Sequence, residues 1–147
     1  MSRTFRAMQR NASRWILGSA GFLTLAGAAA TQESALKPVA SVTQIMQAMV
    51  IPSSNALFDV PRNPPADESG WAAVRNHAVV LAESGNLLLI GDRAQDSEVW
   101  TRTSRGLAEA GEVALKAAQA RDVGAITEVG GRIIEACESC HEKHWIR

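Results

Sequence analysis

The two cysteines of the chain lie three residues apart near its C-terminal end, in the segment CESCHEKHW, and a histidine directly follows the second one. Cys137, Cys140 and His141 thus form the pattern Cys-x-x-Cys-His, which is the attachment sequence of c-type haem. In such a site each thiol adds to one vinyl group of the porphyrin, and the histidine supplies an axial nitrogen to the iron. On a helix the three side chains emerge from one face. The motif predicts one covalent haem c, held by the two cysteines and ligated by His141.

Three other interpretations of the cysteines stay open. A disulfide between Cys137 and Cys140 would close too small a loop to stabilise the fold much. A redox-active pair of the thioredoxin type needs a neighbouring βαβ unit, and the sequence carries few strand signals. A zinc site made of Cys137, Cys140, His141 and His144 has suitable ligand types. Its adjacent ligands at 140 and 141 make a poor tetrahedral set, so haem is the favoured interpretation.

The first thirty residues have the layout of a secretory signal peptide. Four arginines lie in the first fourteen residues, and no acidic residue occurs before Glu33. A small and apolar stretch of sixteen residues follows at 15–30 and ends in three alanines. It is short for a membrane span, which needs about twenty residues; an uncleaved anchor is the alternative. We expect residues 1–30 to be cleaved after Ala30 and the protein to be exported to a bacterial periplasm.

Cleavage leaves residues 31–147 as one domain, with eleven basic and fifteen acidic residues and a formal charge of −4. This charge, together with the lack of a basic patch interleaved with aromatics, argues against nucleic acid as a partner. No membrane span is expected after cleavage. The expected location agrees with the haem motif, because haem of this kind is attached outside the bacterial cytoplasm.

The exported part shows helical rather than strand periodicity. Apolar residues recur at helical spacing in four segments, of which the first is expected to end at Pro52. Aspartates are expected to cap the second and the fourth segments. Four amphipathic helices with short or proline-rich connections predict an all-α fold, an antiparallel four-helix bundle whose last helix carries the haem motif. The expected helices cover about residues 37–50, Asp67 to Leu89, Asp96 to Ala120, and Asp122 to Trp145.

A Cys-x-x-Cys-His motif on the closing helix of a bundle resembles the class II cytochromes c, the family of cytochrome c′ and its low-spin, six-coordinate relatives. The similarity rests on the segment ACESCHEKHW and on IMQAMVIPSSNALFDV at residues 45–60. The chain departs from the family at His144, where an aromatic residue is usual, and at Trp145, where five-coordinate members often carry arginine. The resemblance covers the mature chain and implies a mono-haem bundle. Because relatives are often dimers, a homodimer is one expected state.

The second axial ligand decides between electron transfer and gas binding. Methionine opposite histidine raises the reduction potential of haem, and in the low-spin relatives this methionine comes from the first helix. Met46 and Met49 are both candidates, one turn apart on one face, and core packing is the alternative for each. The resemblance favours Met46, with Met49 as the second choice. His77 on the second helix is a third candidate, for which a buried structural histidine is the more usual explanation.

The expected function is to carry single electrons between periplasmic redox proteins, without catalysis by the protein itself. The alternative is a five-coordinate haem protein that binds nitric oxide or carbon monoxide. His144 is expected to pack against the porphyrin edge or to meet a haem propionate, and Trp145 to cover that edge or to pack in the bundle. The cationic candidates for the propionates, each with a solvated surface position as the alternative, are Arg75, Arg102, Arg105 and Lys143.

Overall fold

The computed structural model of the protein describes residues 36–95 and 98–144. The predicted signal peptide at 1–30, the helix start expected at Asp96 and the aromatic Trp145 lie outside the described residues, so what the sequence predicts for them stays a prediction.

The regular structure of the described ranges is entirely helical, as predicted, and they contain no strand. A short helical stretch precedes the long helices and is made of three consecutive parts, one of them a π-helical turn. In chain order the elements are α1 (Val42–Ile45), the π turn η1 (Met46–Val50), α2 (Ile51–Asp59), α3 (Glu68–Leu87), the 3₁₀ turn η2 (Gly91–Arg93), α4 (Val99–Ala120) and α5 (Val123–His144). We call the continuous stretch α1–η1–α2 the N-terminal arm.

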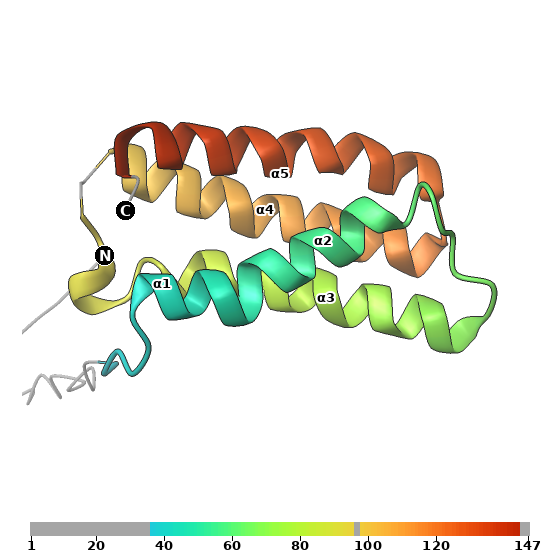
Figure 1. Cartoon of the computed structure of the whole chain (residues 1–147), viewed down its shortest axis with the longest axis horizontal. Helices are drawn as coiled ribbons and strands as arrows, with labels where there is room; N and C mark the ends of the chain where they lie inside the picture. The colour runs from blue at the N-terminus through green and yellow to red at the C-terminus, as the bar shows by residue number, and fades with distance from the viewer. Residues whose placement is uncertain (1–35, 96–97, 145–147) are drawn as a thin grey trace, which may run out of the picture. The chain divides into compact units, whose positions relative to one another are not determined.

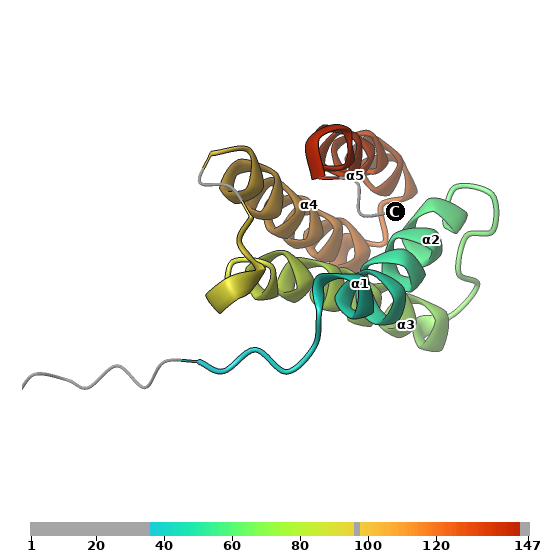
Figure 2. The same ribbon diagram turned by 60° about the vertical axis from the view of Figure 1, so that its left-hand side comes forward.

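The helices pack as a bundle in which each of α2, α3, α4 and α5 contacts two neighbours. α3 contacts α4, α4 contacts α5, α5 contacts α2, and α2 closes the ring by contacting α3. Figure 1 shows α4 between α3 and α5, and the turned view in Figure 2 shows α5 facing both α4 and the N-terminal arm. None of the helices in the described part of the chain is both long and apolar enough to cross a membrane.

Side-chain caps set where three of the helices begin. Asp67 and Asp122 cap α3 and α5, as predicted, because each carboxylate accepts a backbone N–H three residues further on, at 2.8 and 2.9 Å. The N-terminal arm starts later than expected, at Val42. There Ser41 and Gln44 form a capping box: each side chain accepts a hydrogen bond from the backbone N–H of the other residue.

The prediction that Pro52 ends the first helix is wrong. In the π turn the N–H of Ile51 donates to the carbonyl of Met46, five residues back, so the chain winds more widely than in an α-helix. Pro52 then falls in the first turn of α2, directly after the widened turn, so the helical stretch continues past a residue that has no N–H to donate. The arm therefore continues to Asp59, and its last turns become available to line a site.

α3 and α4 meet along small side chains, and each helix contributes a glycine to the contact. A Cβ built on Gly85 would lie 2.5 Å from the carbonyl oxygen of Ser104, and one built on Gly111 would lie 2.4 Å from the nitrogen of Ala82. The backbones are therefore closer than any side chain on these two glycines would permit. We call this contact the small-residue seam; it consists of Ala82, Gly85, Ser104, Ala108 and Gly111.

Trp100 anchors the start of α4 to the end of α3. It is 1% exposed, and its indole Nε1–H donates to the carbonyl of Leu88 at 2.8 Å. Beside it the buried Arg93 guanidinium donates to the carbonyls of Ala40 and Leu87, at 2.9 and 2.8 Å, which ties the segment before α1 to α3. The inward faces predicted for the last two helices are buried at Trp100, Leu107, Ala110, Ala114 and Ala117 and at Ile126, Val129 and Ile133.

Candidate functional site

A cavity of about 450 Å³ lies between the N-terminal arm and α5. Its size falls in the range of small-molecule and cofactor sites, about 300–1,000 Å³. We call it the main cavity. Its lining is mostly apolar, with Val42, Met46, Val50, Ile51, Phe58, Trp100, Cys137 and Cys140 beside the polar side chains of Thr43, Gln47, Ser54, Asn55, His141 and His144.

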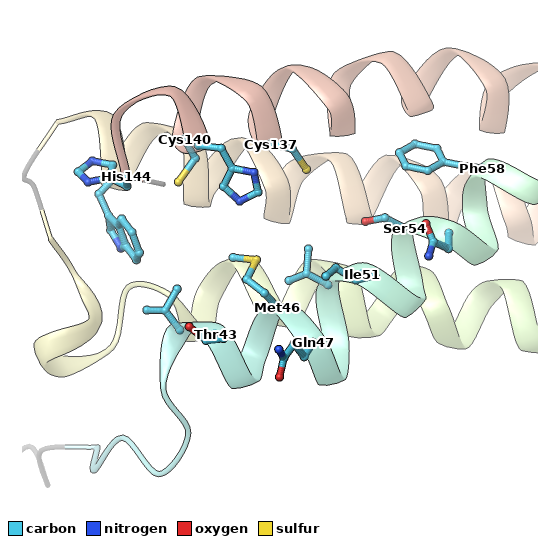
Figure 3. A pocket seen from close by; sticks show the side chains of 14 residues that line it. Thr43, Met46, Gln47, Ile51, Ser54, Phe58, Cys137, Cys140 and His144 are labelled. Atoms are coloured by element: carbon cyan, nitrogen blue, oxygen red, sulfur yellow. The ribbon is translucent and has the colours of Figure 1, made fainter. Parts of the chain in front are cut away.

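The last turns of α5 place the predicted haem-attachment residues on the wall of the main cavity. Cys137, Cys140 and His141 all line it, because residues i, i+3 and i+4 share one face of a helix. Figure 3 shows the two sulfur atoms pointing into the space between α5 and the N-terminal arm, with Met46 on the other side. The geometry thus presents two thiols and one imidazole to the same apolar space.

The two thiols have the properties of neutral, partly buried side chains. Both are free of disulfide bonds. Burial raises the pKa of Cys137, to which the neighbouring Cys140 and Glu138 add; burial also raises the pKa of Cys140, although a hydrogen bond with Thr103 partly offsets it. A redox-active pair depends on a thiolate that forms easily, so the raised pKa values weigh against this interpretation.

The arrangement of the polar side chains does not match the four-ligand zinc site considered above. Within residues 36–95 and 98–144, no three His, Cys, Asp or Glu side chains converge closely enough to hold a metal ion. A haem iron would need fewer ligands from the protein than zinc, because the porphyrin supplies four nitrogens.

The structure separates the three candidates for a second axial ligand. Met46 lines the main cavity and also a smaller inner cavity of about 20 Å³ behind it, and His141 lines both cavities too. Met49 packs against the core and lines neither cavity. His77 is half-buried on α3 and lines neither. Of the three candidates, the fold brings Met46 to the Cys-x-x-Cys-His motif.

The far wall of the main cavity was not anticipated from the sequence, because the first helix was expected to end at Pro52. Ser54 and Phe58 line the cavity from α2, and the continuing helical spacing of Val50, Ser54 and Phe58 could have indicated them. Phe58 lies against Gly130 of α5: a Cβ on that glycine would be 3.6 Å from the Phe58 ring. The arm and α5 are therefore in contact at this point, and a methyl group at residue 130 would fit beside the ring.

Three buried polar atoms make no hydrogen bond with the described part of the chain, and all three belong to residues on these cavities. They are the hydroxyls of Ser54 and Ser104 and the Nε2 of His144. Ser54 and His144 line the main cavity, and Ser104 lines the inner one. Since buried polar groups are normally paired, a ligand with polar groups in these cavities would give such atoms partners. An apolar, thiol-bearing cavity with such atoms on its wall fits a haem.

The cationic side chains proposed for the propionates lie elsewhere. Arg75 pairs with Glu68 at the start of α3, and Arg102 and Arg105 line surface hollows along α4. Lys143 is exposed and does not line the main cavity. Among the described residues that line the main cavity there is no lysine or arginine.

Comparison of the chain with known protein families, with curated proteins and with solved structures finds no match.

Proposed function

We propose that this protein is an exported, mono-haem c-type cytochrome of the class II kind, an antiparallel four-helix bundle that carries single electrons between periplasmic redox partners. One observation carries the proposal: a Cys-x-x-Cys-His motif lines an apolar cavity of cofactor size, and a methionine from the opposite element lines the same cavity. A motif of this kind that faced a filled core would leave no room for a porphyrin. On an open surface it would leave the porphyrin exposed to water.

The roles of the chain's residues follow from their places on the wall. Cys137 and Cys140 would hold the porphyrin through two thioethers, whose formation from S–H and vinyl C=C groups needs no oxidant. His141 would ligate the iron from α5, and Met46 would be the second ligand, from η1. Haem, when bound, supplies a centre that accepts and returns one electron.

The other residues on the cavity wall would affect the reduction potential of the haem and shield it from water. Met46 as a thioether ligand raises the reduction potential relative to a second histidine. Val50, Ile51 and Phe58 surround the site with hydrocarbon, which disfavours the more highly charged oxidised state. A methionine on the second axial position also blocks the binding of nitric oxide or carbon monoxide that a five-coordinate iron would allow.

The test uses the full chain, produced in a bacterial periplasm together with a cytochrome c maturation system. We expect a mature protein that begins at Thr31, a mass increased by one covalent haem, and a low-spin absorption spectrum that carbon monoxide does not change. Replacing both Cys137 and Cys140 by alanine should abolish covalent attachment. A bare polypeptide from the unaltered chain, with free or mutually bridged sulfurs, would refute the proposal.

A matched pair of variants tests the second ligand. Met46→Ala should remove the methionine–iron absorption band and make the ferrous protein bind carbon monoxide. Met49→Ala, one turn away on the same arm, should keep the band. If the unaltered protein already binds carbon monoxide readily, the five-coordinate alternative replaces the electron carrier.

A further inference from the structure

The imidazole of His144 is a polar group at one end of the main cavity. Its Nε2 is buried and has no hydrogen-bond partner among the described residues, and the side chain lines the cavity. Figure 3 places His144 and Thr43 at one end of the cavity and Ser54 and Phe58 at the other. The polar nitrogen therefore marks one particular end of the site.

The orientation of this imidazole is fixed by a rigid neighbour. The rings of His144 and Trp100 meet edge to face, with centroids 5.3 Å apart and planes at 86°. Trp100 is itself almost fully buried and anchored through its indole N–H to the carbonyl of Leu88 at 2.8 Å. A contact of this geometry is favourable between aromatic rings. The unpartnered nitrogen is thus held by a side chain that cannot easily move.

The wall of the main cavity offers few groups that could bind the acidic edge of a haem. The cavity has no arginine or lysine among the described residues that line it, whereas a haem carries two carboxylates on its rim. A histidine can donate a hydrogen bond to a carboxylate, and such charge-assisted bonds are among the stronger ones in proteins.

We propose that His144 is the positioning residue that holds a carboxylate of the bound porphyrin, through a hydrogen bond from Nε2, and that Trp100 orients it for this purpose. This inference rests on the proposed function and adds to it the recognition of the porphyrin's acidic edge.

The first experiment compares His144→Phe with His77→Phe in the covalent haem protein. Phenylalanine keeps a ring beside Trp100 but removes the nitrogen, and His77 offers the same substitution on α3, away from both cavities. We expect the propionate bending band of the resonance Raman spectrum to shift in His144→Phe and to stay in place in His77→Phe. An unshifted band in His144→Phe would overturn the proposal, even though the protein remains a cytochrome.

The second experiment needs no covalent attachment. Ferric protoporphyrin IX and its dimethyl ester are titrated into the full chain without haem, and binding is followed by quenching of tryptophan fluorescence. We expect the free acid to bind about tenfold more tightly than the ester, and His144→Phe to bring this ratio close to one while His77→Phe retains it. An equal ratio in the unaltered chain would remove the role of His144. Failure of both porphyrins to bind a chain whose circular dichroism is helical would instead count against the haem site itself.

Discussion

Two contacts of the bundle are built in opposite ways. Along the small-residue seam, glycine, alanine and serine let the backbones of α3 and α4 approach until a single methyl group has no room. Between the N-terminal arm and α5, larger side chains such as Phe58 and Met46 stand around a cavity of about 450 Å³. Of the three buried polar atoms without a partner among the described residues, those of Ser54 and His144 line the main cavity, and the hydroxyl of Ser104 lies where the seam meets the inner cavity. We therefore expect stability to depend mainly on the contact between α3 and α4, and the proposed ligand site to depend on the arm and α5.

Truncating one large apolar side chain on each side should show the difference most clearly. Leu81 on α3 is fully buried, and Leu81→Ala should lower the free energy of unfolding by about 2–5 kcal/mol. Ile51 lines the cavity and is 52% exposed, so Ile51→Ala should cost at most about 1 kcal/mol in the chain without haem. Urea unfolding of both variants measures the two costs, and similar values would contradict the comparison. With haem attached, the cost of Ile51→Ala should rise, because the cofactor covers this side chain.

Adding a methyl group to the seam should have the next largest effect. Gly111→Ala places a Cβ 2.4 Å from the Ala82 nitrogen, and overpacking of this kind costs about 1–3 kcal/mol. Gly106→Ala is the matched control, since it lies on the same helix and its Cβ would meet nothing within 4 Å. We expect this control to be stabilised by about 0.5–1 kcal/mol, the helix preference of alanine over glycine. Thermal unfolding that ranks the two variants in the reverse order would show that the helices are not in close contact.

The smallest effect on stability is expected from a change at the surface, where the start of α3 meets the end of α4. The carboxylate of Glu68 accepts hydrogen bonds from Arg75 and from Arg121 at the end of α4. These bonds, that of Arg75 first, hold the pKa of Glu68 below its usual range. The stabilisation is therefore present above the ordinary carboxyl pKa and is lost as the pH falls through the lowered pKa.

Glu68→Gln should flatten this part of the acid unfolding profile and lower the melting temperature slightly at neutral pH, since exposed ion pairs contribute little. Glu112→Gln, on the exposed face of α4, is the control and should leave the profile unchanged. Equal profiles for the two variants would show that the Glu68 clamp does not contribute.

Features of the fold that depend on local chemistry could be predicted from the sequence. Asp67 and Asp122 cap helices because each carboxylate needs only a backbone N–H three residues away. The shared face of the Cys-x-x-Cys-His motif follows from helical spacing alone. The capping box of Ser41 and Gln44 is equally local, because each side chain needs only a backbone N–H three residues away.

Features that depend on hydrogen-bond register or on distant contacts could not be predicted. Whether Pro52 ends a helix depends on which carbonyl Ile51 bonds to, and this choice is set by packing of the arm on α3 and α5. The approach of Phe58 to Gly130 joins elements far apart in the chain. Likewise, the sequence could not show that the Nε2 of His144 is buried without a partner, because this depends on the elements packed around it.

The π turn also sets the rotational phase between the two halves of the arm. If Met46–Val50 wound as a regular α-helix instead, everything after it would be turned by about 100°. Ser54 and Phe58 would then face another direction, while Met46 would keep its place opposite α5. One surplus residue before a proline is thus what aligns the two halves of a single wall.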